Sequence, residues 1–480
     1  MRILHTSDWH LGKSLEQINR IEEQRDFISC LTKIVEEEKI DMILVSGDVY
    51  DTNNPSTAAE ELFYEAVDKL NGKGKRPVIV IAGNHDNPER LCAASPLAYK
   101  YGIILLGYPK SDAGRYKVNT DNITLVDSGP GWIELGITNC NESAVILTLP
   151  YPSESRLEEV LATEADEELL QLAYSDRIGN LITKLKDKFR EDTINLIMSH
   201  LFMLGGKEGG SERTIQVGGA YTVNPTVLPS NTHFAALGHL HRPQWVKDAP
   251  CPACYSGSPL AYSFSEADYA KAVYIIDTEP GREADIKEIF LDCGKPLKCW
   301  IAKKGVLQAL EWCEKGKDKN AWIDLQIVTD RPLTTEEQKK LRQLHPGIIN
   351  IKPLIKAEYI KDENYENREG RKIDQLFMEF YRYKTGVEIS DELMVTFLEV
   401  VNGENMKTIE KEEDIEYQEG IENLEDMEDL EDIEDIEGTE NIQNMQDAEY
   451  TQEQESTEDR ESMAEEDSIA DEDSMAGDNL

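Results

Sequence analysis

Residues 78–90 read VIVIAGNHDNPER, and this stretch decides the fold class. Its apolar run ends at Gly83 and is followed directly by Asn84, His85 and Asp86. A short apolar run bounded by glycine is typical of a buried strand. Burying polar groups at the end of such a strand costs free energy, so we expect these groups to bind a ligand or to take part in a reaction. The stretch therefore predicts a buried strand that presents an amide, an imidazole and a carboxylate to a ligand.

Four other apolar runs end in the same way. RILHTS leads to Asp8-Trp9-His10, MILVS to Gly47-Asp48-Val49-Tyr50-Asp51, INLIMS ends at His200, and FAAL leads to Gly238-His239-Leu240-His241. In a parallel or mixed sheet such ends gather at one rim, where ligands bind. Asp8/His10 and His239/His241 are two residues apart, so both members of each pair can point the same way. Glycine before Asp48, Asn84 and His239 allows a close backbone approach.

The first 278 residues alternate apolar runs with amphipathic helical stretches. We predict helices at 20–38, 56–71 and 166–190, and strands at 2–6, 41–46, 77–82, 103–106, 144–149, 194–198, 234–237 and 272–276. Strands that alternate with helices indicate a layered α/β domain with a buried sheet. Residues 1–278 are therefore predicted to form the main domain.

A smaller α/β unit is predicted over residues 279–362. It would contain the strands IKEIFL, WIDLQIV and IINIKPLI, with one helix near 305–315 and another beginning at PLTTEEQ. Residues 363–403 follow as a helical segment whose apolar residues, in 371–402, have helical spacing. These stripes would either dock on a partner helix or pack within the chain against 279–362.

The charge of the chain is concentrated at its C-terminal end. The net charge is −44, and residues 404–480 contain 32 acidic and 3 basic side chains. Apolar residues recur every three positions from Leu424 to Ile436, a spacing that builds no single face on a helix of 3.6 residues per turn. We predict that 404–480 is a disordered acidic tail, which either solvates the protein or mimics DNA and limits non-specific binding.

The composition also excludes some classes of protein. No apolar run reaches 18 residues, so no segment is predicted to span a membrane. Eight scattered cysteines are typical of free thiols in a cytoplasmic protein. The pattern G-x-x-x-x-G-K-[ST] is missing from the sequence, so ATP hydrolysis by a P-loop is not expected of this chain.

The ordered set D-x-H, G-D-x-x-D, G-N-H-D, H and G-H-x-H resembles the calcineurin-like metallophosphoesterase superfamily. Within this superfamily, the sequence is most similar to the SbcD-type nuclease subunits, over roughly the first four hundred residues. The stretches that carry this similarity are HTSDWHLGK, VSGDVYD, AGNHD, GHLHRPQ and YSGSPLAYSFSE. The resemblance implies a layered β-sandwich flanked by helices, with a smaller α/β capping domain and C-terminal helices. It also implies a DNA double-strand exonuclease and single-strand or hairpin endonuclease.

The resemblance implies a role for each motif residue. Asp8, His10 and His241 would bind one divalent metal ion, Asn84, His200 and His239 would bind a second, and Asp48 would bridge them. His85 would act on the leaving oxygen as a catalytic residue that binds no metal. Asp51 is our candidate to orient His85, although related nucleases often carry His at this place, and Asp86 is expected to fix the loop.

Two divalent metal ions, with Mn²⁺ preferred, are the cofactors that the family implies, and the N and O donors fit this choice. The implied partners are DNA and an SbcC-like coiled-coil ATPase, in a heterotetramer with two copies of each subunit. Two alternatives stay open: another calcineurin-like phosphatase or phosphodiesterase, and a metal-free scaffold of the same fold.

Overall fold

The computed structural model describes residues 1–118, 120–157, 167–212 and 221–355, together with seven single residues between 377 and 397. The chain divides into two units, Met1–Asn364 and Tyr365–Leu480. The predicted tail, 404–480, lies outside the described residues, and so does the predicted helical segment 363–403 apart from those seven positions. Among the described residues, no helix combines the length and the apolar character that crossing a bilayer requires.

A six-stranded sheet contains the N-terminal strand. Its order is β15-β14-β1-β2-β3-β4, where β1 to β4 are parallel and β14 and β15 are antiparallel to their neighbours. The strands are β1 Arg2–Thr6, β2 Met42–Ser46, β3 Val78–Ile81, β4 Ile103–Leu106, β14 Lys271–Asp277 and β15 Asp285–Leu291. The predicted buried strand of the opening stretch is thus β3, which lies between β2 and β4.

A second sheet has seven strands in the order β12-β13-β11-β8-β7-β6-β5. They are β5 Ile123–Gly129, β6 Trp132–Ile137, β7 Ser143–Leu149, β8 Ile194–His200, β11 Phe234–Gly238, β12 Gln244–Trp245 and β13 Ala253–Tyr255. The central strands β7, β8, β11 and β13 run parallel. Strands β9 Phe202–Met203 and β10 Thr222–Val223 form a separate short pair.

The two sheets face each other across one apolar core. Alternate residues of each strand point to opposite faces, so Ile79 and Ile81 of β3 lie in the core shared with Leu196 and Met198 of β8. The intervening Val78 and Val80 belong to a different cluster, on the outer face. This arrangement confirms the layered α/β fold that the alternating strands and helices predicted.

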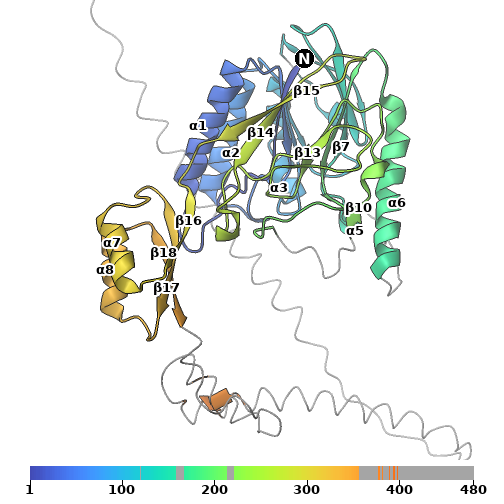
Figure 1. Ribbon diagram of the computed structural model, residues 1–480. Helices are drawn as coiled ribbons and strands as arrows, with labels where there is room; N and C mark the ends of the chain where they lie inside the picture. The colour runs from blue at the N-terminus through green and yellow to red at the C-terminus, as the bar shows by residue number, and fades with distance from the viewer. Residues whose placement is uncertain are drawn as a thin grey trace, which may run out of the picture. The chain divides into compact units, whose positions relative to one another are not determined.

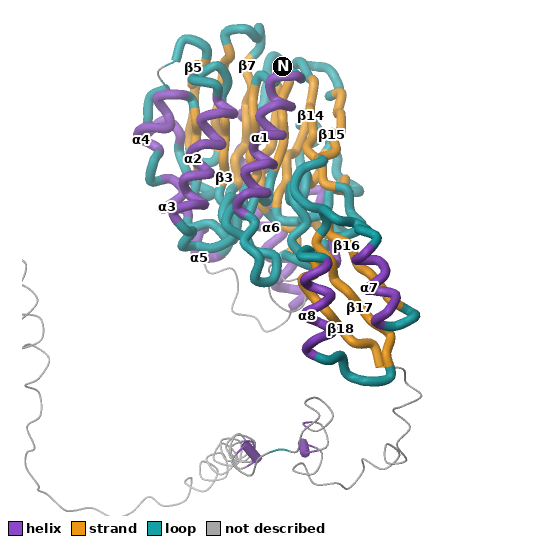
Figure 2. Tube along the Cα trace, turned by 90° about the vertical axis from the view of Figure 1, so that its left-hand side faces the viewer, coloured by secondary structure: helices purple, strands orange, loops and turns teal. Residues whose placement is uncertain are grey.

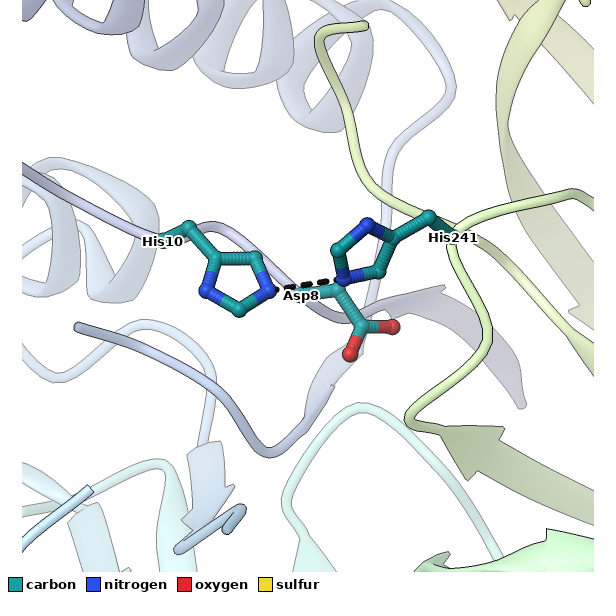
Figure 3. A group of neighbouring side chains, drawn as sticks. All are labelled: Asp8, His10 and His241. Atoms are coloured by element: carbon teal, nitrogen blue, oxygen red, sulfur yellow. Dashed lines mark hydrogen bonds between the residues drawn. The ribbon is translucent and has the colours of Figure 1, made fainter. Parts of the chain in front are cut away.

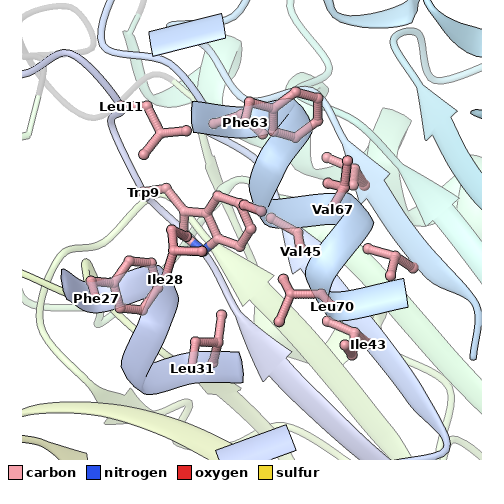
Figure 4. Close-up of a cluster of buried hydrophobic side chains, with 14 of the residues drawn as sticks. Trp9, Leu11, Phe27, Ile28, Leu31, Ile43, Val45, Phe63, Val67 and Leu70 are labelled. Carbon is pink, nitrogen blue, oxygen red and sulfur yellow. The ribbon is translucent and has the colours of Figure 1, made fainter. Parts of the chain in front are cut away.

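Helices cover both outer faces of the sandwich (Figure 1). On the first sheet, α1 Ile21–Glu37 and α2 Thr57–Asn71 lie side by side (Figure 2), and their apolar faces bury Trp9, Phe27, Phe63 and Leu70 (Figure 4). On the second sheet, α6 Glu167–Leu185 contributes Tyr174, Ile178 and Ile182 to a third cluster. The short helices are α3 Pro88–Cys92, α4 Ser95–Ala98 and α5 Glu154–Leu157, with 3₁₀ turns η1 Tyr99–Tyr101, η2 Ala113–Arg115, η3 Lys186–Lys188, η4 Pro225–Val227 and η5 Phe264–Glu266.

The smaller sheet consists of three parallel strands with two helices. The elements are β16 Leu297–Ala302, α7 Val306–Glu314, β17 Trp322–Thr329, α8 Thr335–Leu344 and β18 Ile348–Ile355, in the sheet order β16-β17-β18. Helix α8 begins with a capping box, in which Thr334 and Glu337 bond to each other's backbone N–H. The strand IKEIFL, which we assigned to this unit, is instead β15 of the six-stranded sheet. A turn at Pro280-Gly281 folds it back on β14, because a hairpin closes a shorter loop than a crossover to a new sheet.

Glu23 connects α1 to the segment that leads into this smaller unit and to β17. Its carboxylate accepts from the Lys295 N–H at 2.6 Å and from Trp322 Nε1 at 2.9 Å. The Arg20 guanidinium donates to the same carboxylate at 2.7 and 3.0 Å. Burial opposes ionisation of Glu23, but the Arg20 contact outweighs it and lowers the pKa of the carboxyl. The ionised Glu23 carboxylate, paired with Arg20, therefore ties helix α1 to the smaller unit.

His5 on β1 is a source of acid sensitivity that lies outside the site. Its ring is fully buried and packs edge-on against Phe234, and burial lowers its pKa from 6.5 to about 3. The unfolded chain therefore binds a proton below pH 6.5 that the folded chain excludes, so stability falls as the pH drops from 6.5 towards 3. We expect His5→Leu to remove about 1.4 kcal/mol of this loss per pH unit. Urea unfolding at pH 7, 6 and 5 would measure the difference, and parallel curves for the two proteins would contradict the prediction.

Candidate metal centre

Five strand ends meet at one rim of the sandwich, where the two sheets approach each other. Strands β1, β2 and β3 deliver their polar residues from the first sheet, and β8 and β11 deliver theirs from the second. Two of the resulting groups have ligand atoms within 4.8 Å of one another: Asp8, His10 and His241, and Asp48, His200 and His239. The structure thus brings together residues that are more than two hundred positions apart in the sequence.

In the first group, the Nε2 atoms of His10 and His241 face each other at 2.8 Å, with the Asp8 carboxylate beside them (Figure 3). Two lone pairs at this distance repel, and a shared proton or cation removes the repulsion. The carboxylate of Asp8 is held in place by Ser7 Oγ, which donates at 2.5 Å, and by the His239 N–H, which donates at 2.9 Å. The set of donors, one carboxylate and two imidazoles, fits a divalent cation.

In the second group, Asn84 Oδ1 lies 2.9 Å from His200 Nε2 and 3.0 Å from His239 Nδ1. Asp48 Oδ2 lies 3.4 Å from His200 Nε2 and 3.7 Å from His10 Nε2, so one carboxylate oxygen stands between the two groups. The donor set is again compatible with a divalent cation, and the position of Asp48 is compatible with a shared ligand.

Four of these residues adopt a backbone conformation that L-residues rarely use. Their φ angles are 52° for Asp8, 46° for His10, 48° for Asp48 and 112° for His239. Such conformations cost roughly 1–3 kcal/mol each and are retained where surrounding contacts enforce them. The Asp8 N–H donates to Gly47 O and the His10 N–H to Asp48 O, both at 3.0 Å, which locks the two strand ends together. Nothing in the sequence motifs predicted this strain.

Two of the predicted glycines allow close contacts. A Cβ on Gly83 would lie 2.1 Å from Asp48 Oδ1, and a Cβ on Gly238 would lie 1.9 Å from the main-chain oxygen of Ser46. That oxygen accepts a hydrogen bond from His200 Nδ1 at 2.9 Å, which leaves Nε2 of His200 as the nitrogen that faces the site. Close packing of the loops therefore fixes the direction of two candidate ligands.

Burial controls the charge of these groups. The side chains are almost fully buried, with exposed fractions of 0% for Asp8 and His10 and 3% for His239. Burial raises the pKa of Asp8 to about 6, lowers that of His239 to about 3, and holds that of His10 well below 6.5. Burial also opposes ionisation of Asp48, but the neighbouring imidazoles, first that of His200, hold its pKa well below the usual range. An ionised Asp48 and neutral imidazoles at His10 and His239 are the protonation states that cation binding requires. His200 differs: burial opposes its charge, but Asp48 outweighs burial and raises the pKa of His200 to about 9, so a cation must displace its proton.

His85 lies at the edge of the centre with an exposed fraction of 7%. The main-chain N–H of His85 donates to Asp48 Oδ1 at 2.8 Å. The ring atom Nδ1 donates to the main-chain oxygen of Asp51 at 2.7 Å. The Asp51 carboxylate is 4.0 Å from the same Nδ1 and instead pairs with Lys13 Nζ at 2.7 Å. Asp51 therefore contacts His85 through its main chain, whereas the sequence analysis suggested its side chain.

Asp86 accepts hydrogen bonds within the loops. Its carboxylate is fully buried and accepts from the N–H groups of Val49, Tyr50 and Gly83 at distances between 2.8 and 3.1 Å. Burial raises the pKa of Asp86 to about 6. These bonds fix the loop that carries Asn84 and His85 against the loop that carries Asp48.

Sequence reasoning missed a network behind His241. Its Nδ1 lies 2.5 Å from Ser211 Oγ, which also bonds to Glu266, and Glu266 pairs with Lys271 Nζ at 2.6 Å. The His241 N–H donates to Glu212 at 2.9 Å. None of these four partners lies in a strand-end motif, although Glu266 ends the stretch YSGSPLAYSFSE, which carried part of the family resemblance.

Arg156 is a second residue that the motifs did not reveal. Its guanidinium donates to the main-chain oxygens of Gly83 at 2.8 Å and Asp86 at 2.6 Å, which are the two ends of the loop carrying Asn84 and His85. The guanidinium also lies 5.4 Å from the centre of the Tyr151 ring. Arg156 therefore braces this loop from helix α5.

Comparisons with known proteins agree with this geometry. The family model described as calcineurin-like phosphoesterase matches residues 1–243. The SbcD subunit of the SbcCD nuclease from Bacillus subtilis (strain 168) is 46% identical over 404 residues, covering 84% of this chain and 98% of that protein. The corresponding protein from Staphylococcus epidermidis is 28% identical over 395 residues, covering 81% of this chain and 95% of that protein.

A solved dimetal phosphatase from Danio rerio is 13% identical, with a TM-score of 0.33 over 60% of this chain and 98% of that chain. The fold, the two groups of candidate metal ligands and the matching family model define a member of the phosphoesterase class. The chain belongs to the calcineurin-like phosphoesterase family and, within it, to the family of SbcD nuclease subunits. The resemblance that the strand-end motifs carried is thereby confirmed.

Proposed function

We propose that this chain is the nuclease subunit of an SbcCD-type complex and hydrolyses DNA phosphodiester bonds. The observation that carries the proposal is the convergence of Asp8, His10, Asp48, Asn84, His200, His239 and His241 at one rim. The 46% identity to a nuclease subunit supports DNA as the substrate. The expected activities are double-strand exonuclease and single-strand or hairpin endonuclease.

Asp8, His10 and His241 would hold one divalent ion, Asn84, His200 and His239 a second, and Asp48 both. When bound, such a pair of ions activates water and stabilises the attacking and leaving oxygens of an in-line displacement. Because the donors are imidazole, carboxylate and amide groups with no thiolate, Mn²⁺ is the ion that we propose. The neutral amide of Asn84 retains positive charge for the phosphodiester, which an aspartate would remove.

The chain's own groups have separate tasks in this mechanism. Nδ1 of His85 is engaged with Asp51 O, so Nε2 is the atom that can give a proton to the leaving oxygen. A hydrogen bond of 2.8 Å from the main-chain N–H of His85 to Asp48 Oδ1 ties the residue that donates the proton to the proposed bridging carboxylate. Buried loops exclude bulk water around these groups, which strengthens their electrostatic effect on the reacting phosphate.

The proposal also includes the partner and the domain plan. An SbcC-like coiled-coil ATPase would supply the ATP-dependent step, in a heterotetramer with two copies of each subunit. We propose residues 1–278 as the nuclease domain, 279–362 as a capping domain apart from β15, which belongs to the nuclease sheet, and 363–403 as the partner-binding segment. The smaller sheet has a basic composition: residues 295–355 contain twelve Lys and Arg against seven Asp and Glu, which is favourable for a segment near DNA.

Cleavage of a labelled DNA hairpin and of p-nitrophenyl phosphate, each with Mn²⁺, tests the proposed function. We expect hairpin cleavage that exceeds phosphatase turnover and rises when the ATPase is co-expressed. Asp48→Asn should reduce cleavage at least about 100-fold, because it removes charge from the shared ligand. Asp127→Asn, on an exposed part of β5, is the matched control. Efficient p-nitrophenyl phosphate turnover without hairpin cleavage would indicate a phosphatase, and neither activity in Mn²⁺ would indicate a scaffold.

A further inference from the structure

One buried nitrogen of the centre lacks a hydrogen-bond partner. Nδ1 of His10 has none among the described residues, although the His10 side chain is fully buried. The opposite nitrogen, Nε2, faces His241 and Asp48 and is the one placed to bind a cation. A neutral imidazole that offers a lone pair at Nε2 carries its hydrogen at Nδ1. His10 thus presents a buried N–H donor, and leaving such a donor unpaired costs roughly 1–3 kcal/mol.

Three other histidines at the centre show what is missing. Nδ1 of His200 donates to Ser46 O at 2.9 Å, and Nδ1 of His85 donates to Asp51 O at 2.7 Å. Nδ1 of His241 lies 2.5 Å from Ser211 Oγ. Each of these rings is oriented by an acceptor on the side away from the reacting centre. His239 differs from these three, because its Nδ1 faces Asn84 Oδ1 at 3.0 Å within the second group. Nδ1 of His10 has no partner at all among the described residues, so its acceptor must be sought among the groups that face it.

The carboxylate of Asp51 is the candidate acceptor. Oδ1 of Asp51 lies 3.7 Å from His10 Nδ1, slightly outside hydrogen-bond distance. The same oxygen is 4.0 Å from His85 Nδ1, which already donates to a main-chain oxygen and has no hydrogen left for the carboxylate. Lys13 Nζ, 2.7 Å from Oδ1, holds the carboxylate at this position. The backbone of Asp51 is fixed as well, because its N–H donates to Leu11 O at 3.3 Å.

We propose that Asp51 is a positioning residue for the metal ligand His10, through a carboxylate that Lys13 anchors, while its main-chain oxygen alone serves His85. This inference rests on the proposed function, since it assigns a role around a bound cation. Accepting a hydrogen bond from Nδ1 fixes the tautomer and the ring angle of His10 and increases the basicity of Nε2. The proposal requires a small rotation of the His10 ring that brings Nδ1 from 3.7 Å to within hydrogen-bond distance of Oδ1. Loss of this carboxylate should therefore weaken the metal and leave proton transfer by His85 intact.

Calorimetric titration of the full-length protein with Mn²⁺ provides the first measurement. Asp51→Asn is expected to weaken Mn²⁺ binding 10- to 100-fold, the usual effect of losing a carboxylate behind a ligating histidine. Asp51→Glu retains a carboxylate within reach of Nδ1 and should restore most of the affinity. Glu60→Gln is the matched control, because it breaks a comparable ion pair, with Arg90 at 2.8 Å, away from the centre. Should Asp51→Asn fail to fold, as judged by thermal unfolding without metal, Asp51→Ser takes its place with the same expectation.

The pH dependence of hairpin cleavage at saturating Mn²⁺ provides the second measurement. Because the main-chain contact to His85 survives every substitution at position 51, the apparent pKa values of the profile should be the same in Asp51→Asn and in the unchanged protein. A shifted profile with unchanged Mn²⁺ affinity would overturn the proposal and show that the Asp51 side chain positions His85 instead. Unchanged affinity together with an unchanged profile would overturn it too. His10→Ala separates this failure from that of the proposed function: if that variant binds Mn²⁺ with full stoichiometry and affinity, the metal centre itself is wrong.

Discussion

His85→Asn is expected to reduce the rate of hairpin cleavage by 10²- to 10⁴-fold while Mn²⁺ affinity changes by no more than a few-fold. The size of the loss is that of removing a positioned general acid. Nδ1 of His85 is occupied by Asp51 O, and His85 belongs to neither of the two groups proposed to bind metal, although its ring shares a third group of possible ligands with His10 and Asp51. Single-turnover cleavage at saturating Mn²⁺ measures the rate, and calorimetric titration measures the affinity.

His233→Asn is the matched control for this experiment. His233 directly precedes β11, whereas the reacting groups follow the other end of that strand, and its Nδ1 accepts only a backbone N–H, that of Asn195. We expect this variant to cleave at the original rate. A His85→Asn protein that no longer binds Mn²⁺ would show that His85 is itself a ligand and would reverse the division of roles.

Gly238→Ala is expected to destabilise the protein by about 3 kcal/mol or more, because its methyl group has no space to occupy. The added Cβ would lie 1.9 Å from the Ser46 oxygen and 2.9 Å from His200 Nδ1. Both neighbours belong to paired strands, so relief requires the two sheets to separate at the rim. Urea unfolding measures the free energy, and Mn²⁺ binding should weaken in parallel because His200 loses its orientation.

Gly136→Ala is the comparison that isolates this clash from the general effect of a glycine substitution. Gly136 lies on β6, where the nearest atom to an added Cβ is 3.5 Å away, in ordinary contact. Its effect on the free energy of unfolding should stay within about 1 kcal/mol. Equal destabilisation by the two variants would show that the approach of the two sheets at Gly238 is not close.

The core strands could be predicted from the sequence because their apolar runs are short and end abruptly. Strands β1, β2 and β3 match the predicted ranges closely, and so do helices α1 and α2. The hairpin of β5 and β6 was not predicted, since β5 is an edge strand whose exposed polar residues interrupt its apolar pattern. Strand β15 was assigned to the wrong sheet, because a local apolar pattern reveals a strand but not its partner.

The candidate site was predictable for a different reason. Polar residues that follow buried strands signal a ligand wherever the strand ends converge, and this signal marked every residue proposed as a ligand. The left-handed conformations of Asp8 and Asp48 carry no such signal, because their residue types are common in any loop. The contact between the Asp51 main-chain oxygen and His85 could not be predicted from the sequence either, because every residue has a main-chain oxygen whatever its side chain.

The first turn of α1 joins two distant parts of the protein. Glu23 holds Trp322 and the Lys295 backbone, while the adjacent Gln24 donates to the main-chain oxygen of His10 at 2.9 Å. A displacement of the small sheet would therefore be transmitted through the first turn of α1 to the backbone of His10, one of the proposed cation ligands.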